Sequence, residues 1–265
     1  MLLRGGQTVS RVSARARGPA WDGARNLGDL GGLPLVDGGT TRQNRVYRSA
    51  APEWMTCEGW DDARAAGLGT VIDLRNEMER GRGDVHPVVR AEAMAGIAIV
   101  HAPTEDPADE EFLAECGPWL DHPRSWAPNL HLFSDKILRV LTTVAKADTP
   151  VLIHCAGGRD RTGMIGSILL VLAGATHQSI VANYEAGFRG AAEHRGHGWS
   201  FDPGTGEWVP AEDESWSTEE LEAALADRRP ALVEWLRSFD VEAYARDSGV
   251  ETVALDSLRR LLADR

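Results

Sequence analysis

The chain has 265 residues, which is enough for one large domain or two small ones. Its hydrophobic fraction of 43% and charged fraction of 26% are typical of a soluble globular domain. No stretch reaches the roughly 18 apolar residues that a membrane span needs, so we expect no stable membrane insertion. The formal net charge of −12 argues against nucleic acid as a partner.

The ends of the chain and its few cysteines suggest a simple organisation. The first 20 residues carry four arginines, no acidic residue and no apolar segment typical of a secretory signal. We therefore expect a disordered basic leader over residues 1–20 and a single domain over 21–265. Three cysteines are too few and too scattered for a disulfide framework or a zinc site. The cysteines favour a reducing cytoplasm, with leaderless secretion as the alternative. We expect no cofactor.

The first third of the chain alternates between strand and helix patterns. Residues 33–49 contain two short β-like runs around Asp37-Gly38-Gly39, which predicts a hairpin. A short helix follows Thr56, a suitable N-cap, and ends near Gly67. Apolar runs at 69–75 and 96–103 predict buried strands.

The middle of the chain contains a long connection and then a clear strand and two helices. Residues 104–128 are acidic and contain four prolines, which is typical of a lid or a disordered connection. Apolar residues spaced by three and four predict an amphipathic helix over 129–147. Residues 149–155 read as a short buried strand, and 162–175 as a central helix that is apolar on nearly all sides.

The last third contains an insertion and then helices. Residues 191–217 are rich in Gly, His, Trp and acidic residues, which predicts an irregular insertion whose histidines lack a common metal-ligand spacing. Helices resume over 218–237, 240–246 and 252–265. The whole pattern predicts an α/β fold: a mostly parallel central sheet flanked by helices, with an N-terminal hairpin and extra C-terminal helices.

The decamer "HCAGGRDRTG" at 154–163 lies between the strand at 149–155 and the helix at 162–175. Strand, glycine-bearing loop and helix in that order turn successive backbone N–H groups toward one point, where the positive end of the helix dipole also lies. Five residues separate Cys155 from Arg161, whose planar guanidinium can donate to two oxygens of a phosphate. The loop therefore predicts an anion cradle with a sulfur at its base.

Within this cradle Cys155 is placed to act as a nucleophile. The local field should favour its thiolate, which can attack phosphorus and form a phosphocysteine that water hydrolyses. We expect His154 to orient the loop by bonding its backbone, and the Thr162 hydroxyl to donate to the sulfur. A rhodanese-type sulfur carrier competes with this interpretation, but its loop typically closes one residue sooner. The phosphate would be held by Ala156, Gly157, Gly158, Arg159, Asp160, Arg161 and Thr162.

The decamer resembles the "HCxxGKDRTG" signature of the atypical bacterial tyrosine phosphatases, a group that includes a secreted mycobacterial enzyme of broad specificity. Four further segments fall in that family's order and spacing, so that the resemblance covers about residues 21–262. They are "NLGDLGG" (26–32), "RVYRSA" (45–50), "VIDLRNEME" (71–79) and "GVETVALDSLRRLL" (249–262).

The resemblance implies a cysteine-phosphatase fold, no metal, and activity on phosphotyrosine, with phosphoserine, phosphothreonine or phosphoinositides as further substrates. A phosphoinositide or inositol-phosphate phosphatase remains the main alternative. A non-catalytic module that binds phosphorylated partners is a second, and the intact Cys155 and Arg161 argue against it. Two departures bear on substrate choice: Arg159 stands where the family usually has lysine, and Gly28 replaces an arginine.

The leaving group also needs a proton, and the alternatives are two aspartates or no dedicated acid. Asp106 follows the strand at 96–103, where many cysteine phosphatases keep an acid on a mobile loop. Asp160 lies in the loop itself, but the donors around it should lower its pKa and make it a poor acid. It would then hold Arg161 or orient the hydrolytic water.

The remaining polar residues of the shared motifs are expected to support the loop. Asp29, Arg48, Asp73 and Arg75 lie near strand ends, and we expect them to form ion pairs that brace the phosphate loop. Oxidation would allow a protective disulfide between Cys155 and either Cys57 or Cys116, but free thiols are the favoured interpretation.

Overall fold

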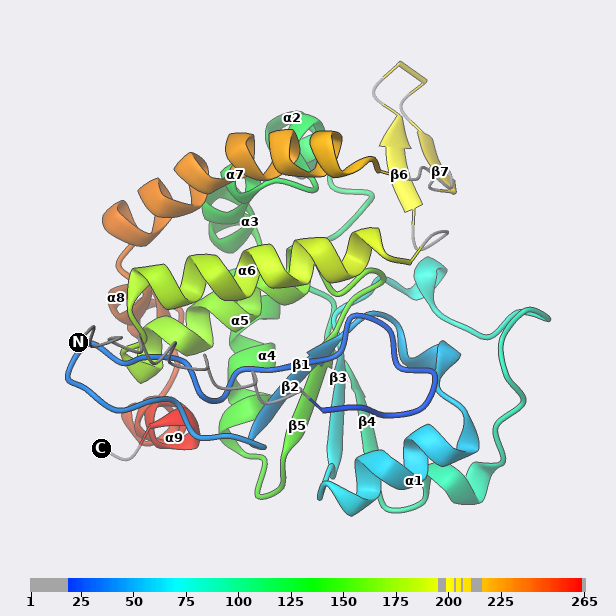
Figure 1. Ribbon diagram of the computed structural model, residues 1–265. Helices are drawn as coiled ribbons and strands as arrows, with labels where there is room; N and C mark the ends of the chain where they lie inside the picture. Colours follow the sequence, from blue (N-terminus) through cyan, green and yellow to red (C-terminus); the bar gives the residue numbers. More distant parts are fainter. Residues whose placement is uncertain (1–18, 195–198, 203, 206, 211–215, 264–265) are drawn as a thin grey trace, which may run out of the picture.

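The computed structural model describes residues 19–194, 199–202, 204–205, 207–210 and 216–263. A five-stranded sheet in the order β1-β2-β5-β3-β4 forms its centre (Figure 1). β2, β5, β3 and β4 are parallel, and only β1 is antiparallel. The expected α/β fold with a mostly parallel sheet flanked by helices is confirmed. The strands are β1 (Gly28–Asp29), β2 (Val46–Ser49), β3 (Thr70–Asp73), β4 (Ala98–His101) and β5 (Val151–His154).

Two helical layers cover the sheet (Figure 1). On one face α4 (Ser134–Ala145), α5 (Asp160–Ala173) and α9 (Thr252–Leu262) form the main core, and further helices pack around them. On the other face α1 (Cys57–Ala65) covers a smaller core. Strand side chains alternate between the faces, so Leu152 joins the smaller core while Val151 and Ile153 join the larger one. The outer helices are α3 (Trp126–Leu132), α6 (His177–Ala192), α7 (Thr218–Ser238) and α8 (Val241–Asp247).

The expected N-terminal hairpin is much smaller than predicted. A single antiparallel bridge joins Pro34 and Thr40 around Gly38 and Gly39, both of which have positive φ. The second β-like run became β2, which pairs with β1 on one side and β5 on the other. All four residues of β2 are buried, so pairing in the central sheet removes more apolar surface from water than a surface hairpin would.

The prediction of a lid or disordered segment over 104–128 was wrong. The segment folds into α2 (Glu110–Cys116) and two 3-10 turns, η4 (Gly117–Trp119) and η5 (Pro123–Ser125), before α3 begins. Asp109 caps α2 by accepting from the backbone N–H of Phe112 at 2.8 Å, and the Phe112 side chain is buried. Two of the prolines start the 3-10 turns, where a missing N–H costs no hydrogen bond.

Other element predictions needed adjustment. Strand 96–103 is the edge strand β4 and is mostly exposed rather than buried. The helix expected over 129–147 is interrupted at Phe133, which separates α3 from α4. The described part of the insertion forms a hairpin rather than an irregular loop, whereas His197 lies outside the described residues. Its strands are β6 (Trp199–Asp202) and β7 (Glu207–Pro210).

The remaining short elements connect the strands. Thr56 caps α1 as expected, accepting from the N–H of Gly59 at 3.2 Å. Between β3 and β4 lie η2 (Glu77–Glu79) and η3 (Ala91–Met94), while η1 (Pro52–Trp54) precedes α1. None of the helices in the described ranges is long and apolar enough to cross a membrane.

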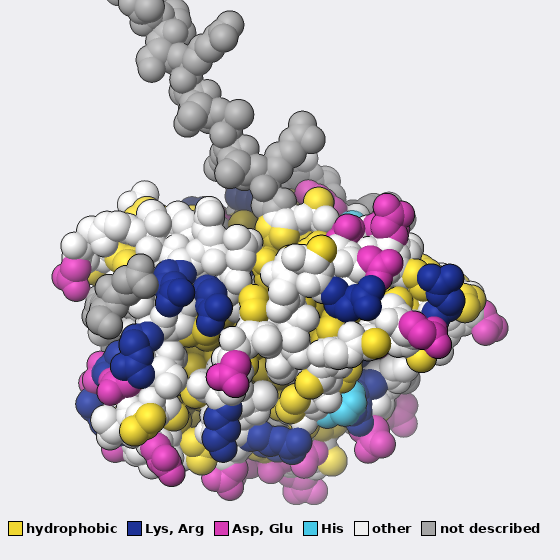
Figure 2. Space-filling model, turned by 90° about the horizontal axis from the view of Figure 1, so that it is seen from below, with side chains coloured by type: hydrophobic (Ala, Val, Ile, Leu, Met, Phe, Trp, Pro, Cys, Tyr) yellow, Lys and Arg dark blue, Asp and Glu magenta, His cyan; other side chains and the backbone are white. Residues whose placement is uncertain are grey.

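The register of the parallel strands places four polar residues in a row at their carboxyl ends. Ser49 is opposite His154, His154 is opposite Asp73, and Asp73 is opposite His101. The carboxyl edge of an open parallel sheet is where ligands bind in such folds. A face of the molecule viewed from below carries mixed hydrophobic, basic and acidic side chains rather than a single sign of charge (Figure 2).

Candidate active site

The loop from Cys155 to Arg161 connects β5 to α5. Neighbouring residues hold it by donating hydrogen bonds to its carbonyl oxygens. The Asn26 side chain donates to the carbonyls of Gly157 and Gly158, at 2.8 and 3.2 Å, and the Ala51 N–H donates to the carbonyl of Ala156 at 2.9 Å. The backbone N–H groups of 156–159 have no hydrogen-bond acceptor among the residues described. The loop therefore presents free donors directly before the positive end of α5.

Cys155 lies at the base of this loop, where strand β5 ends. It is a free cysteine with 3% of its surface exposed, and its side chain belongs to the main core. The hydroxyl of Thr162 is buried and has no hydrogen-bond partner within the described part of the chain, so the expected bond to the sulfur is not made here. Cys57 and Cys116 are also free, and burial raises the pKa of Cys116 to about 12.

His154 supports the loop from behind, as expected. Its Nδ1 lies 3.2 Å from the carbonyl oxygen of Cys155, and its Nε2 lies 3.7 Å from Oδ1 of Asp73. Burial lowers the pKa of His154, and the nearby Asp73 carboxylate offsets this only in part. A neutral, fully buried imidazole that bonds the backbone suits a positioning role better than proton transfer to substrate.

Arg161 is fixed by two glutamates. Its Nη1 and Nη2 donate to the two oxygens of Glu79, both at 2.5 Å, and Oε1 of Glu105 lies 3.3 Å from Nη1. Burial acts to raise the pKa of Glu79, but the hydrogen bonds and charge of Arg161 outweigh it and keep that pKa low. Burial raises the pKa of Glu105 despite Arg161. A guanidinium has five N–H donors, so the pairing with Glu79 leaves donors for a phosphate.

Asp160 differs from the expectation. Burial raises its pKa, and the neighbouring charge of Arg159 offsets this only in part, whereas a lowered pKa was predicted. Its Oδ2 accepts from Nε of Arg159 at 2.8 Å, and its Oδ1 is buried with no partner among the described residues. The negative charge of the nearby Asp121 carboxylate also raises the pKa of Asp160, because it disfavours the charged form of that residue. The prediction failed because it counted the donors and not the cost of desolvation.

Arg159 stands where the resembling phosphatases usually have lysine, and its planar guanidinium donates hydrogen bonds to two carboxylates. Nε donates to Asp160, and Nη2 donates to Oδ2 of Asp121 at 3.1 Å. Its guanidinium also lies 4.9 Å from the centre of the Phe188 ring. Arg228 of α7 approaches the same ring at 4.8 Å and donates to the same Asp121 oxygen at 2.7 Å. Two arginines thus join the loop to the C-terminal helices.

Asp106 lies in a different setting. It is half-buried, and its Oδ1 accepts from the backbone N–H of Ala108 at 3.0 Å. Its carbonyl oxygen accepts from the N–H of Asp109. These bonds close a turn before α2. The neighbouring Glu105, in contrast, lies 3.3 Å from Arg161 of the phosphate loop.

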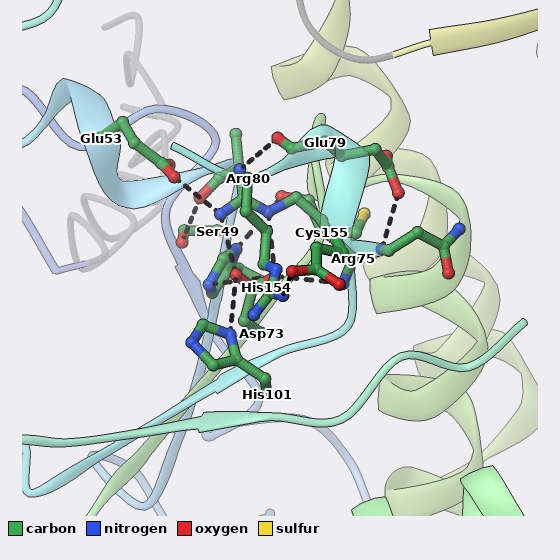
Figure 3. A network of polar contacts seen from close by, with 12 residues as sticks. Ser49, Glu53, Asp73, Arg75, Glu79, Arg80, His101, His154 and Cys155 are labelled. Atoms are coloured by element: carbon green, nitrogen blue, oxygen red, sulfur yellow. Dashed lines mark hydrogen bonds and ion pairs between the residues drawn. The ribbon is translucent and has the colours of Figure 1, made fainter. Parts of the chain in front are cut away.

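The expectation of bracing ion pairs holds for Asp73 and Arg75 (Figure 3). Arg75 donates to both oxygens of Asp73, at 2.9 and 2.8 Å, and to Glu53 at 2.7 Å. Its Nη1 also donates to the backbone carbonyl of Glu79 at 3.2 Å. Because Glu79 holds Arg161, these contacts connect the end of β3 to the phosphate loop.

Asp29 and Arg48 support the site without ion pairs among the described residues. Asp29 accepts from the backbone N–H groups of Gly31 and Asn44, both at 2.8 Å, and so closes a loop next to β1. Arg48 donates to the side chain of Asn26 at 3.0 Å, and Asn26 in turn holds the phosphate loop. Burial lowers the pKa of Arg48 to about 10.

Four residues that shape the site were not predicted to do so. Asn26 and Glu79 lie inside two of the quoted motifs, so their positions offered a signal that went unused. Glu105 and Asp121 lie in the segment that was expected to be a lid, where an acidic composition hides individual contacts. They are Asn26, Glu79, Glu105 and Asp121.

The profile of the tyrosine phosphatase family matches residues 19–264. The chain belongs to this family.

Two known proteins are similar to parts of this chain. "Putative tyrosine-protein phosphatase H16_A0669" of Cupriavidus necator is 28% identical over 171 residues, 62% of this chain and 61% of that protein. The "Tyrosine-protein phosphatase" of Nostoc commune is 52% identical over 40 residues, 15% of this chain and 14% of that protein. The match thus spans less than two thirds of either relative.

Among solved structures, TpbA of P. aeruginosa has a TM-score of 0.41 and 16% identity, with 87% of this chain and 97% of that one covered. The catalytic core of Siw14 has a TM-score of 0.40 and 16% identity, with 77% of this chain and 85% of that one covered. Neither similarity assigns a role to a residue of this chain.

Proposed function

We propose that this chain is a cysteine-dependent phosphatase that hydrolyses phosphotyrosine and related aryl phosphate monoesters. The carrying observation is the loop itself: Cys155 lies at its base, neighbouring residues hold its carbonyls, and its N–H groups at 156–159 have no acceptor among the described residues. Such a cradle suits a phosphate group directly above the sulfur. The resemblance of 154–163 to the signature of the atypical bacterial phosphatases supports the same proposal.

The reaction proceeds in two displacements. The Cys155 thiolate attacks phosphorus, the bond to the ester oxygen breaks, and the alcohol or phenol leaves with a proton from an acid. Water then attacks the phosphocysteine, its proton passes to the conjugate base, and the thiolate is released with inorganic phosphate. Arg161 and the amides of 156–161 hold the phosphoryl oxygens and stabilise the charge of both transition states.

We propose Asp160 as the acid. Its raised pKa keeps a proton available, and one of its oxygens has no partner in the described structure. Asp160 immediately precedes Arg161, so it shares the loop that holds the phosphate. Asp106 uses its carboxylate to close a turn, so we assign it a structural role.

A comparison of two cysteine variants tests the mechanism. With EDTA present, the wild type should hydrolyse para-nitrophenyl phosphate, and Cys155→Ser should lower kcat by at least about 1000-fold because the nucleophile is lost. The matched control is Cys57→Ser, a half-buried free cysteine in α1, which should keep full activity. Activity that needs an added metal, or that survives in Cys155→Ser, would contradict the mechanism.

The same two proteins separate the alternative functions. Phosphopeptide binding without turnover by the wild type would indicate a non-catalytic binding module. A panel of phosphotyrosine peptide, phosphoserine peptide and phosphoinositide measures specificity, and we expect the highest kcat/KM on phosphotyrosine. Hydrolysis of the other two at comparable rates would indicate a dual-specificity or lipid phosphatase.

A further inference from the structure

A cavity lies on the opposite face of the sheet from α5, beside the carboxyl ends of β3 and β4. Its volume is about 160 Å³, which is close to that of an engineered core cavity that holds one benzene ring. Trp60, Met94 and Ile99 give it apolar walls, and the segment 80–82 closes one side. A single six-membered ring fits this space.

Polar atoms in the walls lack partners. Nε1 of Trp60, Nε of Arg80 and Oε2 of Glu53 are all buried with no hydrogen-bond partner in the described part of the molecule. Buried polar groups are nearly always hydrogen-bonded, so each exception needs an explanation. Two of these atoms, Nε1 of Trp60 and Nε of Arg80, are donors, so an acceptor group that reached them would supply the missing hydrogen bonds.

The cavity also carries a local excess of positive charge in an acidic protein. Three arginines and two carboxylates line it, whereas the whole chain has a net charge of −12. Arg75 is paired with both carboxylates, those of Asp73 and Glu53. Arg82 donates instead to the backbone carbonyls of Glu53 and Pro87, at 2.8 and 2.7 Å. Nη2 of Arg80 lies 3.9 Å from Oε1 of Glu77, a long ion pair to an exposed carboxylate. Arg80 and Arg82 therefore keep donors for an anion.

We propose that this cavity is a second binding site, separate from the phosphate loop, for a small carboxylate that carries one apolar ring. The ring would lie against Trp60, Met94 and Ile99, and the carboxylate would face Arg80 and Arg82. Apolar walls with a few convergent polar groups are the usual composition of a small-molecule site.

Residues next to the cavity contact the phosphate loop (Figure 3). His154 lines the cavity, and its Nδ1 lies 3.2 Å from the carbonyl oxygen of Cys155. Arg80 directly follows Glu79, which holds Arg161 with both carboxylate oxygens. A negative charge bound here opposes the arrival of a phosphate dianion at the phosphate loop. If the proposed phosphatase function holds, occupation should therefore lower kcat/KM by about two- to fivefold.

Benzoate is the probe, with neutral benzamide as its matched control. Titration followed by ligand-observed NMR should give a dissociation constant of about 1 mM or lower for benzoate. Benzamide should bind about fivefold more weakly or worse, because it lacks the charge. This measurement needs no catalytic activity, so it decides the proposal even if the phosphatase mechanism fails.

Three variants locate the site. Ile99→Trp fills the cavity from the half-exposed edge strand and should abolish benzoate binding, whereas Arg82→Gln should weaken it about fivefold. Arg237→Gln, an exposed arginine of α7, should have no effect. Thermal unfolding checks that each variant is folded. If Ile99→Trp does not fold, the result for Arg82→Gln decides the outcome.

Each remaining result counts for or against the site. No benzoate binding by the wild type would mean that the cavity holds only water, and this would overturn the proposal. Unchanged binding in both Ile99→Trp and Arg82→Gln would place benzoate elsewhere, such as the phosphate loop, and would overturn it too. If benzoate binds at the cavity and kcat/KM does not change, the proposed effect on catalysis is contradicted, whereas the binding site itself is supported.

Discussion

Asp160 and Asp106 differ in what surrounds their carboxylates. Asp160 is partly exposed, with 20% of its side chain accessible, yet its Oδ1 is buried without a partner among the described residues. Asp106 uses Oδ1 to accept from a backbone N–H in a turn. Burial disfavours the charged form of a carboxylate, while hydrogen bonds to that form favour it. The two residues should therefore respond differently to neutralisation.

Replacing each aspartate by asparagine tests the assignment of the acid. Asp160→Asn should lower kcat/KM about 100-fold on phenyl phosphate, a poor leaving group, and much less on para-nitrophenyl phosphate. Asp106→Asn is the control and should lose about twofold or less on both. A loss that depends on the leaving group in Asp106→Asn, but not in Asp160→Asn, would reverse the assignment.

The pH profile gives an independent check on Asp160. An acid works only while protonated, so wild-type activity should fall as pH rises through the pKa of Asp160. Because that pKa is raised, the fall should begin above the usual range of a carboxyl. Asp160→Asn should lose this limb on phenyl phosphate.

At the scale of elements, the turn between β5 and α5 depends on Gly158. Its φ is +65°, and a Cβ there would lie 2.4 Å from the carbonyl carbon and oxygen of Ser49 in β2. Neither atom belongs to a flexible side chain, so the loop rather than the strand should shift.

Gly158→Ala should therefore lower kcat/KM by about 100-fold, because a shift of about 1 Å in the cradle misplaces the phosphate. Gly38→Ala is the matched control: its φ is +93°, but nothing lies within 4 Å of the added Cβ. It should cost about 1 kcal/mol in the free energy of unfolding and leave activity unchanged. The two effects separate in steady-state kinetics and urea unfolding, and near-normal activity in Gly158→Ala would contradict the role of the turn.

The elements also show what the sequence could and could not predict. Strand β5, helix α5 and the loop between them were predictable because continuous apolar runs bracket a glycine-rich polar segment. Helix α6 was not predicted, although Thr176 caps it by accepting from the N–H of Ser179. The segment 104–128 looked like a loop because its prolines and acids describe composition, whereas its order depends on burial of Phe112 and Cys116.

The residues of the candidate site likewise divide into those that the sequence could predict and those that it could not. Cys155 and Arg161 are recognisable from their spacing and flanking elements alone. The partners of Arg161 were not, since Glu79 and Glu105 reach it from segments 82 and 56 residues away in sequence. The sign of the Asp160 pKa shift also depends on burial, which a sequence does not give.

At the scale of the whole molecule, the C-terminal helices and the phosphate loop belong to one core. Leu255 and Leu258 of α9 are buried in the same hydrophobic cluster as Cys155. The N–H of Arg42, near the start of the chain, donates to the carbonyl of Leu262 at 2.7 Å. Loss of packing at α9 should therefore destabilise the entire domain rather than one end of it.

Leu258→Ala tests this dependence. The side chain is 1% exposed, so its truncation should lower the free energy of unfolding by about 2–5 kcal/mol. Val253→Ala, on the same helix but 72% exposed, is the control and should change it by about 0.5 kcal/mol or less. Urea unfolding followed by circular dichroism, tryptophan fluorescence and residual activity should give one midpoint for all three signals, because a single core unfolds cooperatively. Activity that survives after the helical signal of α9 is lost would show that the phosphate loop is stable without the C-terminal helix.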